Sequence, residues 1–437
     1  MSRSLLAFLG VSDYLPCNYE LYGKKVDNVR FVQEALASML CEDWNEDDRI
    51  IIFLTKEAKN RNWVDNGHIK SGKPLPREGL ERRLKSLNLK AKIIPVDVPE
   101  GKTENELWEI FDIILQQINE EDEVIFDITH AYRSLPLLVI ILLNYARVLK
   151  HIEIKGIYYG AFEVLGSRPE VSEMNIKDRN APIFDLTPFA YLFDWTSAIN
   201  NFITYGDARS IFELTDKQLA PIFREAKRKD DNAIQLKNLG SQLKKFTELI
   251  LTTRGYDIVR GTSRGFNVDE LKKLIKINKG SMLKPINPLL DRISSKVENF
   301  HKDDIQNGYR AVEWCIEHGL IQQGITLLQE TMISEIVVKH FGWDKINDRE
   351  KRELVVDAIN TKIKKLSKSK EGESDKARNN KKDIEKIMEE LDDDFLRIYD
   401  SISQHRNDIN HAGFKNNPHN PENLKKKLRE NFEKLER

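Results

Sequence analysis

The sequence has few cysteines, and no apolar run in it is long enough to cross a membrane. Only three cysteines occur among 437 residues, and none stands in a CxxC pair. This scarcity argues against a disulfide framework and a structural zinc site, and it fits a reducing compartment. The run Leu5–Leu9 is too short for a signal-peptide core, and the longest apolar stretch, Leu135–Ala146, falls short of the ~20 residues that span a bilayer. We therefore expect a soluble, cytoplasmic protein.

Glycine-rich nucleotide motifs and a charge excess are also absent. Neither GxGxxG nor GxxxxGK[ST] occurs, which disfavours an NAD enzyme and a P-loop ATPase. The 69 basic and 70 acidic residues nearly cancel. A balanced chain does not bind nucleic acid by bulk charge, so any contact with RNA must come from a local patch.

The N-terminal part alternates short β-rich runs with helical patterns. This alternation predicts βαβ units and a mostly parallel, Rossmann-like sheet. The predicted strands are Leu5–Leu9, Arg49–Leu54, Ala91–Val96, Glu123–Ile128 and Glu153–Tyr159, and the predicted helices are Val26–Leu40, Gly79–Leu87, Glu104–Ile118 and Leu135–Lys150.

The rest of the chain has helical periodicity. We assign residues 1–187 to the α/β domain, 188–303 to a helical middle region and 304–437 to an all-α domain. The segment Arg254–Arg264 carries three arginines among glycine and serine, which is typical of a hairpin or a basic surface loop. The run Lys362–Lys382 is almost entirely polar and indicates a solvated insertion.

Two loops beyond predicted strand ends carry residues that suit a phosphate or a base. Ligands of open α/β sheets bind outside the carboxyl ends of the strands. The second loop leads into a helix whose N-terminus favours a phosphate, with Pro136 in its first turn. An alternative is that Asp127, Thr129 and Ser134 only tie this turn together. The candidates are Gly10, Ser12 and Asp13 in the first loop, and Thr129, His130, Arg133 and Ser134 in the second.

A second candidate site lies near the C-terminus. Arg406, Asn407 and His411 fall on one short helical stretch, and Gly413 is placed to end it. An imidazole can move protons near neutrality, and a guanidinium can neutralise the charge of a pentavalent phosphorane. This set suits RNA cleavage without a metal, giving a 2′,3′-cyclic phosphate. A dimer that pairs two such helices would build a fuller site. A solvent-facing His411 is the alternative, and His405 is interpreted as a bystander.

Together these segments resemble the CARF–HEPN ribonucleases of type III CRISPR systems. In that family a CRISPR-associated Rossmann-fold (CARF) sensor precedes a HEPN (higher eukaryote and prokaryote nucleotide-binding) nuclease domain. The segments that carry the resemblance are Ser4–Gly10, FDITHAYRSLP (Phe126–Pro136), EWCIEHGLIQQGITLLQE (Glu313–Glu330) and RNDINH (Arg406–His411), of which FDITHAYRSLP is the most specific.

The resemblance implies a homodimer, or a higher oligomer, that is allosterically activated by a cyclic oligoadenylate and cleaves single-stranded RNA in antiviral defence. It assigns the two N-terminal loops to the activator and Arg406, Asn407 and His411 to the nuclease, with no metal or other cofactor. We favour a ring of four adenylates over six, although the loops alone do not fix its size. A DNA-binding, non-catalytic regulator and a sensor that degrades its own ligand stay open.

Overall fold

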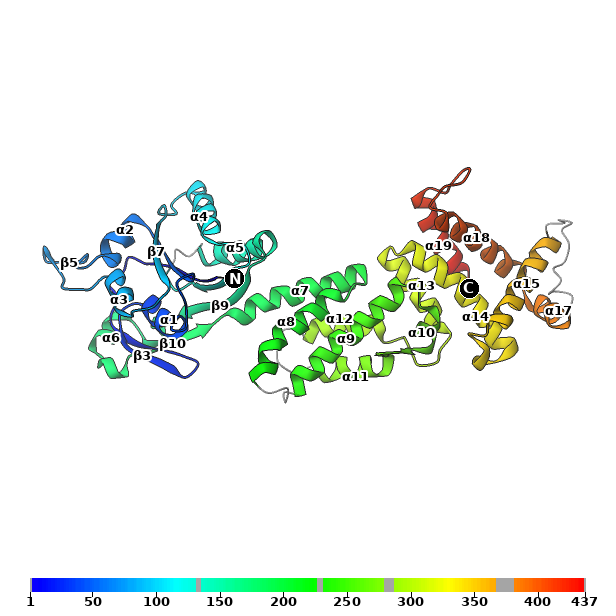
Figure 1. The fold of residues 1–437 in the computed structure, drawn as a ribbon, viewed down its shortest axis with the longest axis horizontal. Helices are drawn as coiled ribbons and strands as arrows, with labels where there is room; N and C mark the ends of the chain where they lie inside the picture. Colours follow the sequence, from blue (N-terminus) through cyan, green and yellow to red (C-terminus); the bar gives the residue numbers. More distant parts are fainter. Residues whose placement is uncertain (1, 131–134, 226–230, 279–286, 367–380, 436–437) are drawn as a thin grey trace. The chain divides into compact units, whose positions relative to one another are not determined.

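The protein forms two compact units, residues 1–191 and residues 192–437. The computed structural model describes residues 2–130, 135–225, 231–278, 287–366 and 381–435 (Figure 1). Each unit is described by itself below.

An eight-stranded sheet forms the centre of the first unit, with the order β3-β2-β10-β9-β8-β1-β4-β7. Neighbours from β9 to β7 all pair in parallel. These five strands are the five that the sequence predicts, so the Rossmann-like, mostly parallel sheet is confirmed. They are β1 (Arg3–Phe8), β4 (Arg49–Leu54), β7 (Lys92–Asp97), β8 (Glu123–Asp127) and β9 (Glu153–Gly160).

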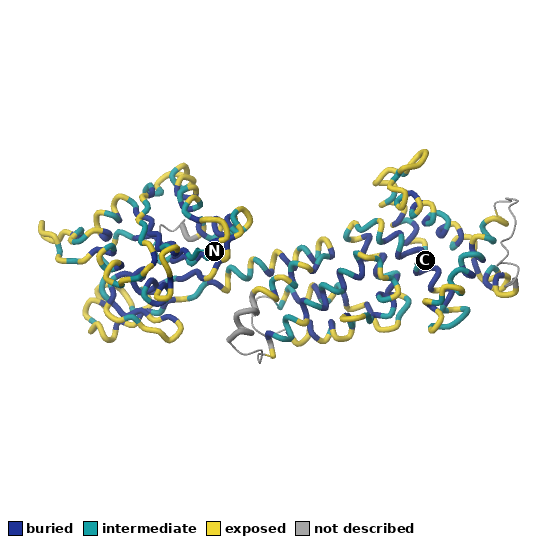
Figure 2. The backbone as a smooth tube through the Cα atoms, viewed as in Figure 1, coloured by how far each residue is buried: buried dark blue, intermediate teal, exposed yellow. Residues whose placement is uncertain are grey.

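Helices cover both faces of this sheet, which explains why its strands are apolar on both sides. Leu5 and Ala7 pack on the face covered by α1 (Val32–Leu40) and α3 (Leu80–Ser86). Leu6 and Phe8 pack on the opposite face, under α4 (Glu104–Gln117) and α5 (Leu135–Lys150). Residues Ile50–Leu54 of β4 are completely buried. The strands of the sheet accordingly form the buried centre of the unit in Figure 2.

Three strands of the sheet are absent from the prediction. β2 (Cys17–Leu21) and β3 (Lys24–Val29) form a hairpin where we expect a loop, and β10 (Asn180–Asp185) lies between β2 and β9. The prediction of a helix from Val26 is wrong for its first residues. Asn28 has a φ of 53°, and α1 begins only at Val32. A residue with positive φ interrupts a right-handed helix.

The described residues of the second unit form helices and one small hairpin. Its helices are α8 (Arg209–Glu225), α9 (Asp231–Leu251), α10 (Gly255–Arg260), α11 (Val268–Asn278), α12 (Asn287–Val297), α13 (Gln306–His318), α14 (Ile321–Phe341), α15 (Arg349–Leu366), α17 (Lys381–Glu390), α18 (Asp393–Asn410) and α19 (Pro421–Leu435), and α7 (Thr187–Tyr205) leads into it. The hairpin, β11 (Thr262–Ser263) and β12 (Phe266–Asn267), follows α10 as the sequence predicts.

Helix α14 forms the centre of the C-terminal part of this unit. It packs against α13, α15, α18 and α19. Its buried residues are distributed all around the helix, as expected of a helix surrounded by others. The helical remainder of the chain is thus confirmed. The boundary at 303/304 and the assignment of residues 304–437 as a HEPN domain stay predictions.

Candidate functional site

The two predicted ligand loops lie side by side at the carboxyl edge of the sheet. β1 pairs in parallel with β8, and Ala7 is opposite Asp127. Among the parallel strands, β4 is the next after β1 and lies on one side of it, whereas β9 is the next after β8 and lies on the other side, so the gap between β1 and β8 is the topological switch point. A cavity of about 460 Å³ opens here. It is lined by Ser12, Asp13, Tyr14, Leu15, Tyr19, His130, Phe162, Glu163, Gly166 and Arg168.

Three of the seven predicted ligand residues line this cavity, namely Ser12, Asp13 and His130. The His130 ring lies 4.3 Å from the ring of Tyr14. Burial lowers the pKa of His130 to about 4, so the imidazole is neutral at physiological pH. A neutral ring has one donor and one acceptor nitrogen, which suits a base or a hydroxyl better than a charge–charge contact with a phosphate.

Two predicted residues have a structural role beside the cavity. The Thr129 hydroxyl donates to Asp127 Oδ1 and accepts the N–H of Gly160 at 2.8 Å, so it ties the turn after β8 to β9. A side chain at Gly10 would overlap the Tyr14 hydroxyl, which lies 2.0 Å from the Cβ position. Arg133 and Ser134 lie outside the described residues, and α5 begins directly after them.

Asp13 is surrounded by guanidinium groups that the sequence analysis did not identify. Its carboxylate lies 3.5 Å from Arg30, 3.1 Å from Arg77 and 2.9 Å from Arg168. Of these arginines Arg168 lines the cavity itself, together with the carboxylates of Asp13 and Glu163. The three guanidinium groups around one carboxylate form a local excess of positive charge beside the cavity, which favours an anionic ligand there. These arginines come from segments far apart in the chain, so no local motif could reveal them.

Asp127 is completely buried below the cavity, and burial raises its pKa to about 6. The folded state therefore holds a proton that the unfolded chain releases between pH ~4 and ~6, and stability falls as the pH rises through this window. We expect Asp127→Asn to increase the free energy of unfolding by about 1–3 kcal/mol at pH 8 and to change little at pH 4. Denaturant titrations at the two pH values measure this.

The matched control for this prediction is Asp122→Asn. Asp122 is also completely buried, but its carboxylate pairs with Arg49 at 2.5 Å. Its neutralisation leaves that guanidinium without a charged partner, so this variant loses stability at pH 8. A loss of stability in Asp127→Asn at pH 8 would contradict the prediction.

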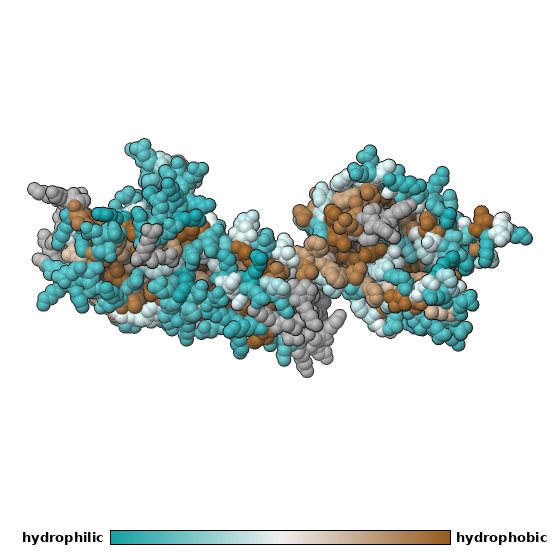
Figure 3. Space-filling view, turned by 180° about the vertical axis from the view of Figure 1, so that it is seen from behind, coloured by the Kyte–Doolittle hydropathy of each residue, from teal (hydrophilic) through white to brown (hydrophobic). Residues whose placement is uncertain are grey.

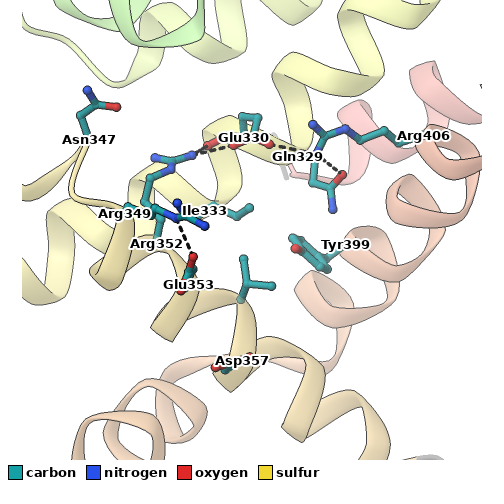
Figure 4. Close-up of a pocket in the computed structure, with 11 residues that line it drawn as sticks. Gln329, Glu330, Ile333, Asn347, Arg349, Arg352, Glu353, Asp357, Tyr399 and Arg406 are labelled. Carbon is teal, nitrogen blue, oxygen red and sulfur yellow. Dashed lines mark hydrogen bonds and ion pairs between the residues drawn. The ribbon is translucent and has the colours of Figure 1, made fainter. Parts of the chain in front are cut away.

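The C-terminal candidates lie at the end of α18, as predicted, but they face different surroundings. Arg406 lines a cavity of about 800 Å³, and its Nη1 donates to Glu330 Oε1 at 2.9 Å and Gln329 Oε1 at 3.1 Å (Figure 4). Asn407 and His411 are exposed and are not among the residues that line this cavity. Within one chain, the guanidinium and the imidazole therefore do not face the same cavity.

The turn after α18 holds His411 in place. The His411 N–H donates to the carbonyl of Asn407 at 3.1 Å, and Gly413, with a φ of 74°, donates to Asp408 O at 3.0 Å. The helix thus ends in a Schellman motif close to the predicted place, but its first left-handed residue is Ala412, with a φ of 51°, and Gly413 follows it. His405, the expected bystander, is buried and stacks on His419 with ring centroids 4.5 Å apart.

We also searched the described residues for metal-binding clusters, membrane-spanning helices and disulfides. No group of three or more His, Cys, Asp or Glu side chains there is arranged to hold a metal ion. None of the described helices combines the length and hydropathy needed to cross a bilayer. All three cysteines are buried and unpaired.

Comparison with known families agrees with the geometry of the first unit. Residues 4–163 match the model of the CARF domain of the CRISPR system endoribonuclease Csx1. The first unit of the chain is therefore similar to a CARF domain of CRISPR-associated proteins. Residues 191–304, which no sequence motif identifies, match the second domain of the CRISPR-associated protein MJ1674. Neither model reaches residues 305–437.

A curated relative supports the same assignment. The CRISPR-associated protein MJ1674 of Methanocaldococcus jannaschii is 32% identical over 183 residues, which are 39% of this chain and 26% of the relative. The match thus spans about a quarter of the relative's length. The cavity at the switch point lies mostly within the residues that match the CARF domain, with Gly166 and Arg168 just beyond them.

Proposed function

We propose that this CARF protein is a metal-independent endoribonuclease that cleaves single-stranded RNA when a cyclic oligoadenylate binds its sensor cavity. The observation that carries the proposal is the end of α18, where Arg406 lines a large cavity and His411 is exposed less than two turns later. The matched CARF model belongs to a protein described as an endoribonuclease, which supports a nuclease here.

In the proposed reaction the His411 imidazole moves a proton to or from the reacting oxygens of RNA. The 2′-hydroxyl attacks the adjacent phosphorus, the 5′-oxygen leaves with a proton, and a 2′,3′-cyclic phosphate results. Arg406 stabilises the negative charge of the phosphorane. Asn407, beside them and exposed, supplies a hydrogen bond to the substrate.

The different surroundings of Arg406 and His411 favour a reaction centre built by two copies of the chain. The first unit carries an apolar surface suited to pairing, because α5 exposes Leu137, Ile141, Tyr145, Val148 and Leu149. Figure 3 shows brown side chains gathered on this part of the unit. Exposed apolar patches of this kind mark protein interfaces.

The sensor cavity supplies the groups that a ring of adenylates requires. The arginines around Asp13 attract its phosphates, and the neutral His130 and Tyr14 offer rings beside which a base can stack. We favour four adenylates over six. The ring activates the enzyme only if it binds the active state of the dimer more tightly than the inactive state.

An assay of RNA cleavage across a ladder of cyclic oligoadenylates tests this function. We expect a labelled single-stranded RNA to be cut only when one ring size is added. Intact RNA under every condition would overturn the proposal. Retarded duplex DNA without cleavage would instead support a DNA-binding regulator, for which the exposed Arg254 and Arg264 provide a basis.

His130 lines the sensor cavity, and its truncation should affect the activator rather than the nuclease. We expect His130→Ala to raise the activator concentration that gives half-maximal cleavage by about tenfold, because a buried contact to a base is lost. The maximal rate at saturating activator stays unchanged, since the nuclease residues are intact. A full activator titration of the cleavage rate separates the two parameters, and an unchanged midpoint would exclude His130 from the ligand site.

A further inference from the structure

Glu330 joins two arginines from different helices. Its Oε1 accepts from Arg406 on α18 at 2.9 Å, and its Oε2 accepts from Arg352 on α15 at 2.7 Å. Figure 4 shows the carboxylate on α14 between the two guanidinium groups. The three helices thus hold one negative charge between two positive charges.

This ion-pair triad lines two cavities of the same unit. A cavity of about 800 Å³ and a second cavity of about 320 Å³ adjoin each other at the triad. Both are lined by Glu330, Asn347, Arg352 and Arg406. Because the side chains of the triad line both cavities, an extended ligand that occupies the two cavities can contact them.

The two arginines depend on Glu330 to different degrees. Arg352 Nη1 also donates to Ser334 Oγ and to the carbonyl of Ile346, each at 2.8 Å. These bonds hold its guanidinium in place without Glu330. Arg406 has one further acceptor, Gln329 Oε1, at 3.1 Å. Two guanidinium groups therefore stay directed at one point if the carboxylate leaves.

The Glu330 carboxylate can also move away from the two arginines, because it is accessible from the cavities. The side chains of Glu330, Arg352 and Arg406 are 37%, 23% and 31% exposed. Water therefore reaches all three side chains, and a ligand that enters the cavities can reach the carboxylate and its two partners. A phosphodiester presents two charged oxygens much as a carboxylate does, and the planar fork of arginine binds both groups.

We propose that Arg352 and Arg406 form a subsite for a phosphodiester of the RNA substrate, and that the Glu330 carboxylate occupies this subsite until RNA binds. The inference rests on the proposed ribonuclease function and adds Arg352 as a second phosphate ligand. The adjoining cavities then hold the nucleotides on either side, with Tyr399 in the larger cavity and Tyr256 in the smaller one available to stack against bases.

The test measures binding and not cleavage. A fluorescent 2′-O-methyl oligoribonucleotide lacks the attacking hydroxyl, and its anisotropy gives Kd at several salt concentrations. We expect Arg352→Ala to weaken binding by about tenfold and to reduce the salt slope, d log K/d log[salt], by about 0.7, since one phosphate contact is lost. We expect Glu330→Gln to tighten binding, because the amide does not compete with phosphate.

The matched control is Arg397→Ala. Arg397 lies on α18 like Arg406, is 77% exposed and pairs only weakly with Asp394 at 3.6 Å. Its removal leaves Kd and the salt slope unchanged. The proposal is overturned if Arg352→Ala, folded as judged by its melting curve, binds as wild type does. If that variant fails to fold, Glu330→Gln decides, and equal or weaker binding in it overturns the proposal.

Parallel cleavage of unmodified RNA separates this inference from the proposed function. If wild type binds the analogue with the expected dependence on Arg352 but cuts no RNA under any condition, the subsite stands and the ribonuclease function fails. If RNA is cut through His411 while binding ignores Arg352 and Glu330, the ribonuclease stands and the subsite fails.

Discussion

The His411→Ala variant is expected to cleave single-stranded RNA at least ~100-fold more slowly than wild type at saturating activator, since general acid–base catalysis contributes about 10²–10⁴-fold. His411 is exposed just after the last residue of α18, so its truncation removes the proposed proton carrier and leaves the packing intact. Single-turnover cleavage of a labelled RNA measures the rate, and binding of labelled oligoadenylate should stay unchanged.

The matched control for His411→Ala is His301→Ala. His301 is likewise an exposed histidine of the second unit, and His301→Ala should cleave at the wild-type rate. If the His411→Ala protein retains full activity, the imidazole is a surface residue and the nuclease site lies elsewhere in the chain.

The second large effect is expected on the exposed face of α5. Ile141 is 55% exposed in the single chain, and Leu137 and Tyr145 lie one turn away on either side of it. If two copies pair through this face, Ile141→Asp buries an unpaired carboxylate in the interface, which costs about 3 kcal/mol and raises the dimer Kd by about a hundredfold. Activation by oligoadenylate should disappear with the dimer.

Sedimentation at a series of concentrations, combined with activated cleavage, measures this effect. Ile69 in β5 (Ile69–Lys70) provides the control, because it is 72% exposed but lies on a two-stranded hairpin away from α5. Ile69→Asp should keep the wild-type mass and activity. A dimeric and activatable Ile141→Asp protein would show that two copies do not pair through α5.

The sequence predicts the centre of the first unit well because local pattern and tertiary environment agree there. A run such as Ile50–Leu54 is apolar at every position, which suits only a strand covered on both faces. The loops could be placed because parallel strands bring their carboxyl ends to one edge.

The missed strands depend on partners far away in the chain. Asn180–Pro182 of β10 pair with β2 about 160 residues earlier, and nothing in so short a segment indicates that pairing. The charged surroundings of Asp13 and Glu330 escape sequence analysis for the same reason. Each combines side chains from three or more elements, whereas a motif records only neighbours along the chain.

The buried thiols of the protein can report the opening of each of its two units. Cys17 and Cys41 lie in the first unit and Cys315 in the second, all buried, and burial raises the pKa of Cys17 to about 11 and of Cys315 to about 12. A thiol that is both hidden and protonated reacts with an alkylating reagent only after its surroundings open. The rate of alkylation at Cys17 and Cys315 therefore follows the opening of each unit separately, without any added label.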